Sequence, residues 1–309
     1  MGYEPAYLSL FRSGELKRRA QDAWARLEDC DLCARSCHVN RRISVKGAVC
    51  RTGERAVVHS FGPHHGEEDP LRGWGGSGTI FFSWCPLRCS YCQNWDISQK
   101  GTGQEVTPEE IASMMLQLQA RGCHNINLVT PSHVVAQTLA ALVKAGEGGL
   151  RLPVVYNTGG YDSLEALALL DGVIDIYMPD MKYGDSEVAF KYSKVKKYVE
   201  VNQAAVREMH RQVGNLVLDE RGIAVRGLLI RHLVLPGGMA GSEQVLSFIA
   251  REISTDTYIN LMDQYRPCYR ADENPPLSSS LTDEEYRTAL RLCGRYNLWR
   301  LDQRTRAPL

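Results

Sequence analysis

Short apolar runs alternate with amphipathic stretches along the chain from about residue 77 onward. The runs are rich in aliphatic and aromatic residues and are bounded by glycine, proline and polar residues, which is typical of buried strands. The stretches between them repeat apolar positions at helical spacing. The pattern predicts six strands, at 78–84, 126–130, 153–158, 173–180, 228–237 and 257–265.

Capping signals mark helices between and after these strands. Thr107 and Glu110 have the spacing of a capping box, and Pro108 stands at the first helical position. Thr282 and Glu285 repeat the signal near the end of the chain. The predicted helices cover 107–122, 132–146, 163–170, 185–213 and 242–253, and a last helix follows Thr282.

The alternation of strands and helices predicts an α/β fold with a parallel sheet, either open or closed into a barrel. It occupies a barrel-sized region at 77–270. Residues 1–76 do not follow the alternation and are predicted to form an N-terminal extension, and 271–309 a C-terminal helical extension. Within the barrel region, 215–227 is predicted to form a small hairpin.

Unusual polar residues stand where the predicted strands end. In parallel α/β folds, ligands bind at the carboxyl ends of the strands, so the pattern predicts a binding site at that edge of the sheet. The residues at these positions are Cys85, Thr130, Asn157, Asp180 and Lys182.

Arg231 lies inside the apolar run 228–237, where a charge is costly unless it is paired. We therefore expect it to have a partner. His232 alternates to the opposite face of the strand and is expected to be a structural histidine. Asp180 and Lys182 have a second interpretation as an ordinary exposed ion pair, which would contribute little.

Three cysteines, Cys85, Cys89 and Cys92, follow the first predicted strand in a C-x3-C-x2-C pattern. Iron–sulfur clusters are held by cysteine thiolates, and three of them leave one iron of a four-iron cluster open for a small ligand. The alternative is a structural zinc site, which needs a fourth ligand. Cys123 and His124 are candidates for that ligand, but nothing in their spacing indicates it.

The three-cysteine pattern, with the aromatic Tyr91 before its last cysteine, resembles the radical S-adenosylmethionine (SAM) superfamily. The resemblance implies a partial (β/α)6 barrel and a [4Fe–4S] cluster on Cys85, Cys89 and Cys92. It also implies that the open iron binds the amino and carboxylate groups of SAM. An electron from the cluster then breaks the C5′–S bond, and the 5′-deoxyadenosyl radical takes a hydrogen atom from the substrate.

Three further stretches, "CQN", "PDMK" and "IRHLVLPG", are similar to those of glycyl-radical activating enzymes such as pyruvate formate-lyase activating enzyme. The similarity covers about 78–267, and the whole chain looks like the activating-enzyme-like Fe–S proteins. It implies oxidoreductase activity on a protein or peptide substrate, with an electron donor such as flavodoxin or ferredoxin. The alternatives are a radical SAM enzyme acting on a small molecule or RNA, and a non-catalytic Fe–S or zinc module.

The same resemblance assigns SAM-binding roles. Tyr91 would lie against the adenine, and Lys182 and Arg231 would bind the SAM carboxylate. Asn157 and Asp180 would lie near SAM or a bound monovalent cation.

The chain departs from the activases at two places. "LVTPSHV" replaces the Gly-Gly-Glu element that holds the SAM amino group. The SAM amino group must therefore be bound by Thr130, Ser132, His133 or a backbone carbonyl. Tyr265 stands where the activases have a histidine at the sixth strand. The SAM chemistry implied by the resemblance does not depend on these two positions. The inference about the identity of the substrate is weakened by them.

A second group of cysteines, Cys30, Cys33, Cys37 and Cys50, has the spacing C-x2-C-x3-C-x12-C. Four thiolates can close a tetrahedral zinc site or hold a complete Fe–S cluster. The first would be structural and the second would relay electrons. Free reduced cysteines are the third interpretation.

Ligand-capable residues also occur in "GPHHGEEDPLRGWGGSG", at 62–78, including Glu67 and Glu68. A solvated loop is the preferred interpretation of this segment. The alternative is a lid whose acidic residues meet the substrate.

Charge and composition limit the classes of binding partner and the cellular compartment that we expect. Lys plus Arg and Asp plus Glu both number 36, so the net charge is +0 and there is no strong nucleic-acid signal. No apolar run is long enough to span a bilayer. Ten cysteines without a recognisable secretory signal indicate a reducing compartment, and we predict a cytoplasmic protein.

Overall fold

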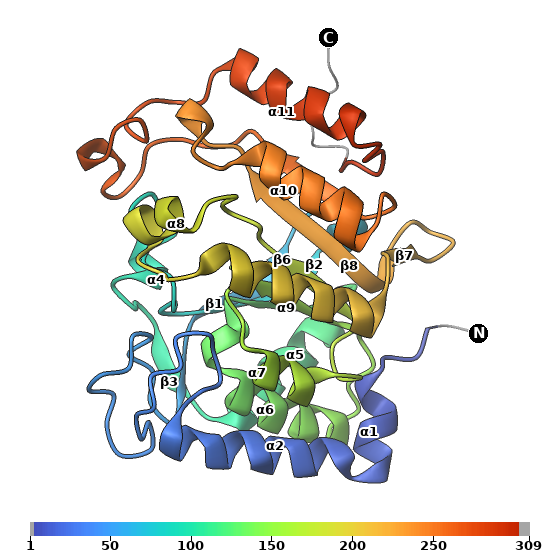
Figure 1. Cartoon of the computed structure of the whole chain (residues 1–309). Coiled ribbons are helices and arrows are strands. Elements are labelled where there is room, and N and C mark those ends of the chain that lie inside the picture. The colour runs from blue at the N-terminus through green and yellow to red at the C-terminus, as the bar shows by residue number, and fades with distance from the viewer. Residues whose placement is uncertain (1–2, 303–309) are drawn as a thin grey trace.

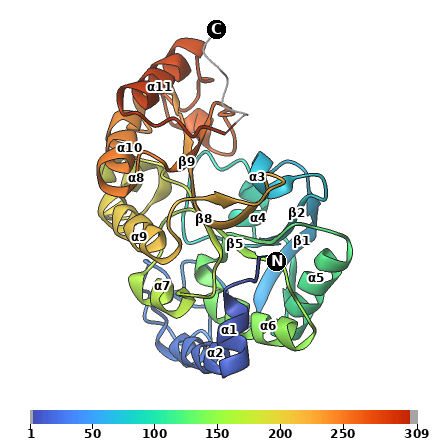
Figure 2. The same ribbon diagram turned by 90° about the vertical axis from the view of Figure 1, so that its right-hand side faces the viewer.

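The computed structural model describes residues 3–302. Its sheet contains six parallel strands whose order in space is their order along the chain (Figure 1). Most of the helices lie outside them (Figure 2), as the partial (β/α)6 prediction requires. The six strands are β2 (Ser77–Phe82), β4 (Ile126–Val129), β5 (Val154–Thr158), β6 (Ile176–Pro179), β8 (Ala224–Leu233) and β9 (Tyr258–Met262).

The side chains of the strands enter two cores, because successive side chains point to opposite faces of the sheet. Tyr156 belongs to the larger core, which includes residues of the outer helices. Val155 belongs to a smaller core with Leu71 on the other face of the sheet. By the same alternation, Asn157, Asp180 and Arg231 lie on the inner face with this smaller core.

The predicted helices form, and both capping boxes are present at Thr107 and Thr282. The predicted helical region 185–213 is divided, because Lys194 and Lys197 adopt left-handed conformations that end one helix and precede the next. None of the helices within residues 3–302 has the length and apolar character that a membrane span needs. The helices are α5 (Pro108–Ala120), α6 (Val135–Glu147), α7 (Leu164–Leu170), α8 (Ser186–Ser193), α9 (Tyr198–Val213), α10 (Ser242–Phe248) and α11 (Asp283–Arg295).

The N-terminal region packs on the barrel. β1 (Ala56–His64) pairs antiparallel with β2, and β3 (Gln104–Val106) pairs with β1, so the sheet continues beyond the six parallel strands. α1 (Tyr7–Ser13) leads into α2 (Glu15–Ala25), which packs along α6 (Figure 1). The boundary at residue 76 stays a prediction.

Two short elements add to the sheet and to the inner core. β7 (Val217–Leu218) pairs antiparallel with the start of β8, which confirms the predicted hairpin. α3 (Asp69–Arg72) precedes β2 and places Leu71 in the inner core.

Candidate active site

The three-cysteine loop follows β2 and ends at α4 (Trp95–Ser98). Trp84, just before Cys85, has a φ of 65°. This conformation is strained for a bulky residue, and such strain gathers at functional sites. Cys89 is buried, and Cys85 and Cys92 are half-buried. The loop thus lies at the carboxyl end of the first parallel strand, as predicted.

The cysteine thiols lie in an environment that opposes their ionisation. Burial raises the pKa of Cys89 to about 11, although Lys182 acts in the opposite direction. Burial, with Cys89 and Cys92 nearby, also raises the pKa of Cys85. Because neighbouring thiolates repel one another, a bound metal is needed to hold all three ionised. This donor set fits iron.

The arrangement does not support the zinc alternative. Within residues 3–302, no group of three or more His, Cys, Asp or Glu side chains is placed to hold a single metal ion. In an iron–sulfur cluster each thiolate binds a different iron, so its cysteines need not converge on one point. Ser193 on α8 adds a hydroxyl that donates to Cys89 Sγ at 3.0 Å.

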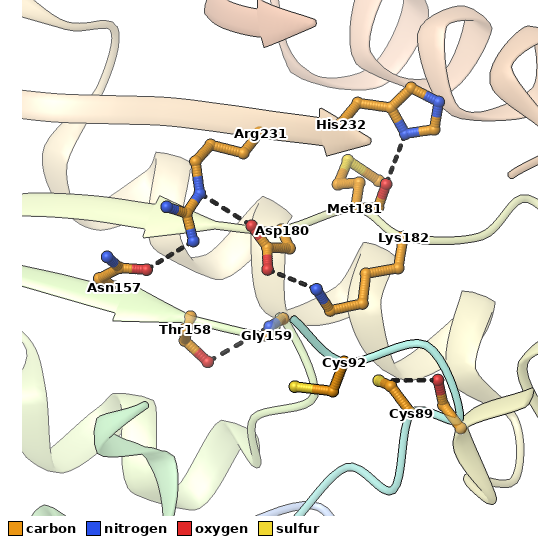
Figure 3. A network of polar contacts seen from close by, with 12 residues as sticks. Cys89, Cys92, Asn157, Thr158, Gly159, Asp180, Met181, Lys182, Arg231 and His232 are labelled. Atoms are coloured by element: carbon orange, nitrogen blue, oxygen red, sulfur yellow. Dashed lines mark hydrogen bonds and ion pairs between the residues drawn. The ribbon is translucent and has the colours of Figure 1, made fainter. Parts of the chain in front are cut away.

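A charged network lies beside this loop (Figure 3). The Asp180 carboxylate accepts from Arg231 Nε at 2.8 Å and from Lys182 Nζ at 2.6 Å. Arg231 Nη2 also donates to Asn157 Oδ1 at 2.6 Å. The side chains of Asp180, Lys182 and Arg231 are only 13%, 20% and 19% exposed. The interpretation of Asp180 and Lys182 as an ordinary exposed pair is therefore wrong, and the expected partner of Arg231 is confirmed.

All three network residues are charged at neutral pH. Burial alone would raise the pKa of Asp180, but Arg231 and Lys182 hold it below its usual value. Burial would lower the pKa of Lys182, but Asp180 and Cys89 hold it above its usual value. The Asp180 carboxylate thus pairs with two cations, and both cations are of a type that forms charge-assisted hydrogen bonds with carboxylates.

Two buried glutamates face the same network, which corrects the solvated-loop interpretation. Glu67 and Glu68 are 7% and 3% exposed. Asn260 Nδ2 on β9 donates to Glu68 Oε1 at 2.9 Å, and both glutamates help to keep the pKa of Arg231 high. They are buried because Leu71 packs into the inner core and brings this segment with it. Contact with a substrate stays a prediction.

Sequence reasoning missed two residues of α9 that support the network. The Tyr198 hydroxyl accepts from the Lys182 N–H at 3.0 Å and contacts the Asp180 carbonyl at 3.2 Å. Asn202 Nδ2 donates to the carbonyls of Gly160 and Asp180. A Cβ on Gly160 would lie 2.2 Å from the Asp180 carbonyl oxygen, so this crossing of two loops requires glycine. Nothing in the amphipathic pattern of α9 distinguishes Tyr198 and Asn202 from other helical positions, so their role cannot be recognised from the sequence.

His232 lies on the outer face of β8, as predicted. Its Nδ1 donates to the Met181 carbonyl at 2.6 Å, and its Nε2 pairs with the Ser242 hydroxyl at 2.9 Å. Burial lowers its pKa to about 4. The neutral ring is therefore a structural link that positions the backbone between Asp180 and Lys182.

Of the three replacements considered for the missing Gly-Gly-Glu element, Thr130 is the most exposed. Thr130 is half-buried with a φ of 61°, and its N–H donates to the Asn157 carbonyl at 2.8 Å. Ser132 and His133 are buried, and His133 Nε2 donates to the Ser83 carbonyl at 3.0 Å. Binding of the SAM amino group by Thr130 stays a prediction.

Tyr91 and Tyr265 pack against each other. Their ring centroids are 6.0 Å apart, and Tyr91 is 5% exposed. The Tyr265 hydroxyl donates to the Leu277 carbonyl, so this residue fastens the segment after β9. The adenine-binding role of Tyr91 stays a prediction.

The N-terminal cysteines lie close together. Cys30, Cys33 and Cys50 are buried, and Cys37 is half-buried. Burial raises the pKa of Cys33, and Cys50, Cys30 and Cys37 act in the same direction because their sulfurs are near.

Comparison with known proteins identifies the family. The model of the family "Radical SAM superfamily" matches residues 79–220. "Uncharacterized protein MJ0674" of Methanocaldococcus jannaschii is 34% identical over 284 residues, covering 88% of this chain and 76% of that protein. The chain belongs to the radical SAM superfamily. The matched region contains the three-cysteine loop, and membership implies an enzyme that uses a [4Fe–4S] cluster and SAM.

Solved structures of low sequence identity are also similar to this radical SAM chain. One is a radical SAM methyltransferase from Sphaerobacter thermophilus, with a TM-score of 0.48 and 14% identity over 71% of this chain. The match spans 64% of that protein, less than two thirds of its length. Another is TYW1 with a lysine–pyruvate adduct bound, with a TM-score of 0.41 and 12% identity, over 70% of this chain and 73% of that one.

Proposed function

We propose that this radical SAM enzyme abstracts a hydrogen atom from a protein or peptide, as glycyl-radical activating enzymes do. The observation that carries the proposal is the ion pair between Asp180 and Arg231, at 2.8 Å. It joins "PDMK" to "IRHLVLPG", the two stretches after the cysteine motif that resemble the activases. Both lie beside the three-cysteine loop, where Lys182 acts on the pKa of Cys89.

Each residue of the network has a role in this proposal. Lys182 and Arg231 would bind the SAM carboxylate, and Asp180 and Asn157 would hold those two side chains in place. Cys85, Cys89 and Cys92 would hold the cluster, which would supply, after reduction by a flavodoxin- or ferredoxin-type donor, the electron for cleavage of the C5′–S bond of SAM.

An aromatic pair beside the cysteine loop offers a surface to which a protein substrate could bind. Trp95 stacks on Tyr269 with ring centroids 5.4 Å apart, and Tyr269 is 41% exposed. Arg270 N–H donates to the Ser90 carbonyl at 2.9 Å and holds this segment against the loop. Tyrosine and tryptophan are enriched in protein interfaces, whereas a net charge of +0 gives RNA no general attraction.

The test uses anaerobically reconstituted protein, SAM and a strong chemical reductant. We expect 5′-deoxyadenosine from the wild type and none above background from Cys85→Ala. The reaction is then offered the protein fraction of cells grown in fully deuterated medium, or the small-molecule filtrate of the same cells. Deuterium entering 5′-deoxyadenosine from the protein fraction supports the proposal. Deuterium from the filtrate alone would exclude a protein substrate and leave the SAM chemistry intact.

A further inference from the structure

The N-terminal cysteine loop is bound directly to the three-cysteine loop. Arg35, between the second and third N-terminal cysteines, donates through Nε to the Pro86 carbonyl at 2.7 Å. Pro86 directly follows the first cysteine of the other loop. In return, Arg88 Nη2 donates to the Val49 carbonyl at 2.5 Å, one residue before the last N-terminal cysteine. The two cysteine loops are therefore neighbours.

A buried cation indicates that the N-terminal sulfurs carry negative charge. Arg41 is 3% exposed and donates to the carbonyls of Thr52 and Gly53 and to Cys30 Sγ, at 3.4 Å. Within residues 3–302, none of the hydrogen bonds of this guanidinium goes to a carboxylate. A buried charge is tolerated when it is paired. Thiolates bound to metal supply that pairing, whereas neutral free thiols do not.

The arrangement favours a cluster over a single zinc ion. A zinc site needs four sulfurs about 2.3 Å from one ion. Such convergence is not found among residues 3–302, where no group of three or more ligand side chains is placed around one point. An iron–sulfur cluster distributes its four thiolates over separate irons and so tolerates a wider set.

We propose that Cys30, Cys33, Cys37 and Cys50 ligate a second iron–sulfur cluster adjacent to the SAM-binding one. Four cysteines leave no iron open, so this cluster would not bind SAM. Its position beside the three-cysteine loop suits a redox centre. The proposal is independent of the substrate of the enzyme.

The variant that decides the question lacks the SAM-binding cluster. It combines Cys85→Ala, Cys89→Ala and Cys92→Ala in the full chain. It is purified anaerobically from cells supplied with both iron and zinc, and iron, acid-labile sulfide and zinc are measured. We expect about two to four irons per chain with equal sulfide, as clusters held by four cysteines contain, and an EPR signal after reduction. One zinc without sulfide, or no metal in protein with native circular dichroism, would overturn the proposal.

A reciprocal pair of variants locates the metal. Cys30→Ala/Cys33→Ala should lose the same number of irons from the otherwise native protein and keep the remainder. Cys293→Ala is the control, because Cys293 is equally buried in α11 and lies in the hydrophobic core, so its variant should keep all the iron. Iron retained in Cys30→Ala/Cys33→Ala would contradict the assignment. If that variant fails to fold, the triple variant still decides.

Discussion

At the residue scale, Asp180 forms ion pairs with two cations at once, so loss of its charge should be costly. Asp180→Asn would remove the carboxylate that pairs directly with both Lys182 and Arg231. Removing one partner of a buried ion pair costs about 3–5 kcal/mol, and we expect a loss of that order in the free energy of unfolding, measured with urea. The control is Asp171→Asn, which removes an exposed pair with Arg211 and should change little. Equal effects of the two variants would contradict the role of Asp180.

Lys182 is expected to contribute to the affinity for SAM as well as to folding. Charge-assisted hydrogen bonds contribute about 1.5–3 kcal/mol, so Lys182→Met should weaken SAM binding by roughly tenfold to a hundredfold. Equilibrium dialysis of the reconstituted protein measures the affinity. Lys191→Met is the control, because Lys191 is exposed on α8. Unchanged affinity in Lys182→Met would remove this residue from the SAM site.

The buried neutral ring of His232 should make the free energy of unfolding depend on pH. Its pKa is lowered to about 4 in the folded chain from an ordinary value of 6.5. The unfolded state therefore binds more protons between these values, and the histidine's contribution to stability is present above pH 6.5 and is lost as pH falls toward 4. From pH 7 to pH 4, the free energy of unfolding should fall by about 3 kcal/mol more in wild type than in His232→Gln. Parallel pH profiles would show that the ring is not buried as a neutral group.

At the scale of elements, the two capping boxes are not equivalent. Glu110 closes only the box of α5, whereas Glu285 closes the box of α11 and also accepts from the Gly237 N–H at 2.6 Å. A lost cap costs about 1 kcal/mol, and the additional hydrogen bond contributes about 1 kcal/mol more. Thermal unfolding should therefore show Glu285→Ala to be less stable than Glu110→Ala. Equal stability of the two variants, or the reverse order, would contradict a stabilising contact between α11 and the turn after β8.

The strands were predictable from sequence because their apolar runs are short, continuous and separated by helices with clear caps. Arg231 was predictable as a paired residue because a charge in such a run needs a partner. Its partners Asp180 and Asn157 come from two other strands, and only the tertiary fold brings the three together.

Other features carried no local signal. β1 was missed because its sequence, "AVVHSFGPH", interrupts the apolar pattern with histidine, glycine and proline. The burial of Glu68 depends on Leu71, three residues later, entering a core formed by distant strands. The support given by Tyr198 and Asn202 likewise depends on contacts across loops that are far apart in sequence.

At the scale of the whole molecule, the N-terminal region and the barrel should unfold together. Leu16 on α2 is fully buried and belongs to the same core as α6. Leu16→Ala should cost about 2–5 kcal/mol and lower the midpoint of a single calorimetric transition. Leu164→Ala is the control, because Leu164 is 48% exposed on α7. A separate early transition in Leu16→Ala would show that the extension is an independent domain.

The hydrogen bonds of Arg35 have a consequence for biosynthesis. Besides the Pro86 carbonyl, Arg35 binds the Lys194 carbonyl at 2.5 Å, 159 positions later in the chain. During translation, the first four cysteines leave the ribosome long before the backbone that holds their loop in place exists. Their loop therefore lacks this hydrogen bond until residue 194 has been synthesised. We therefore expect the proposed cluster to be assembled in this loop after synthesis of the barrel.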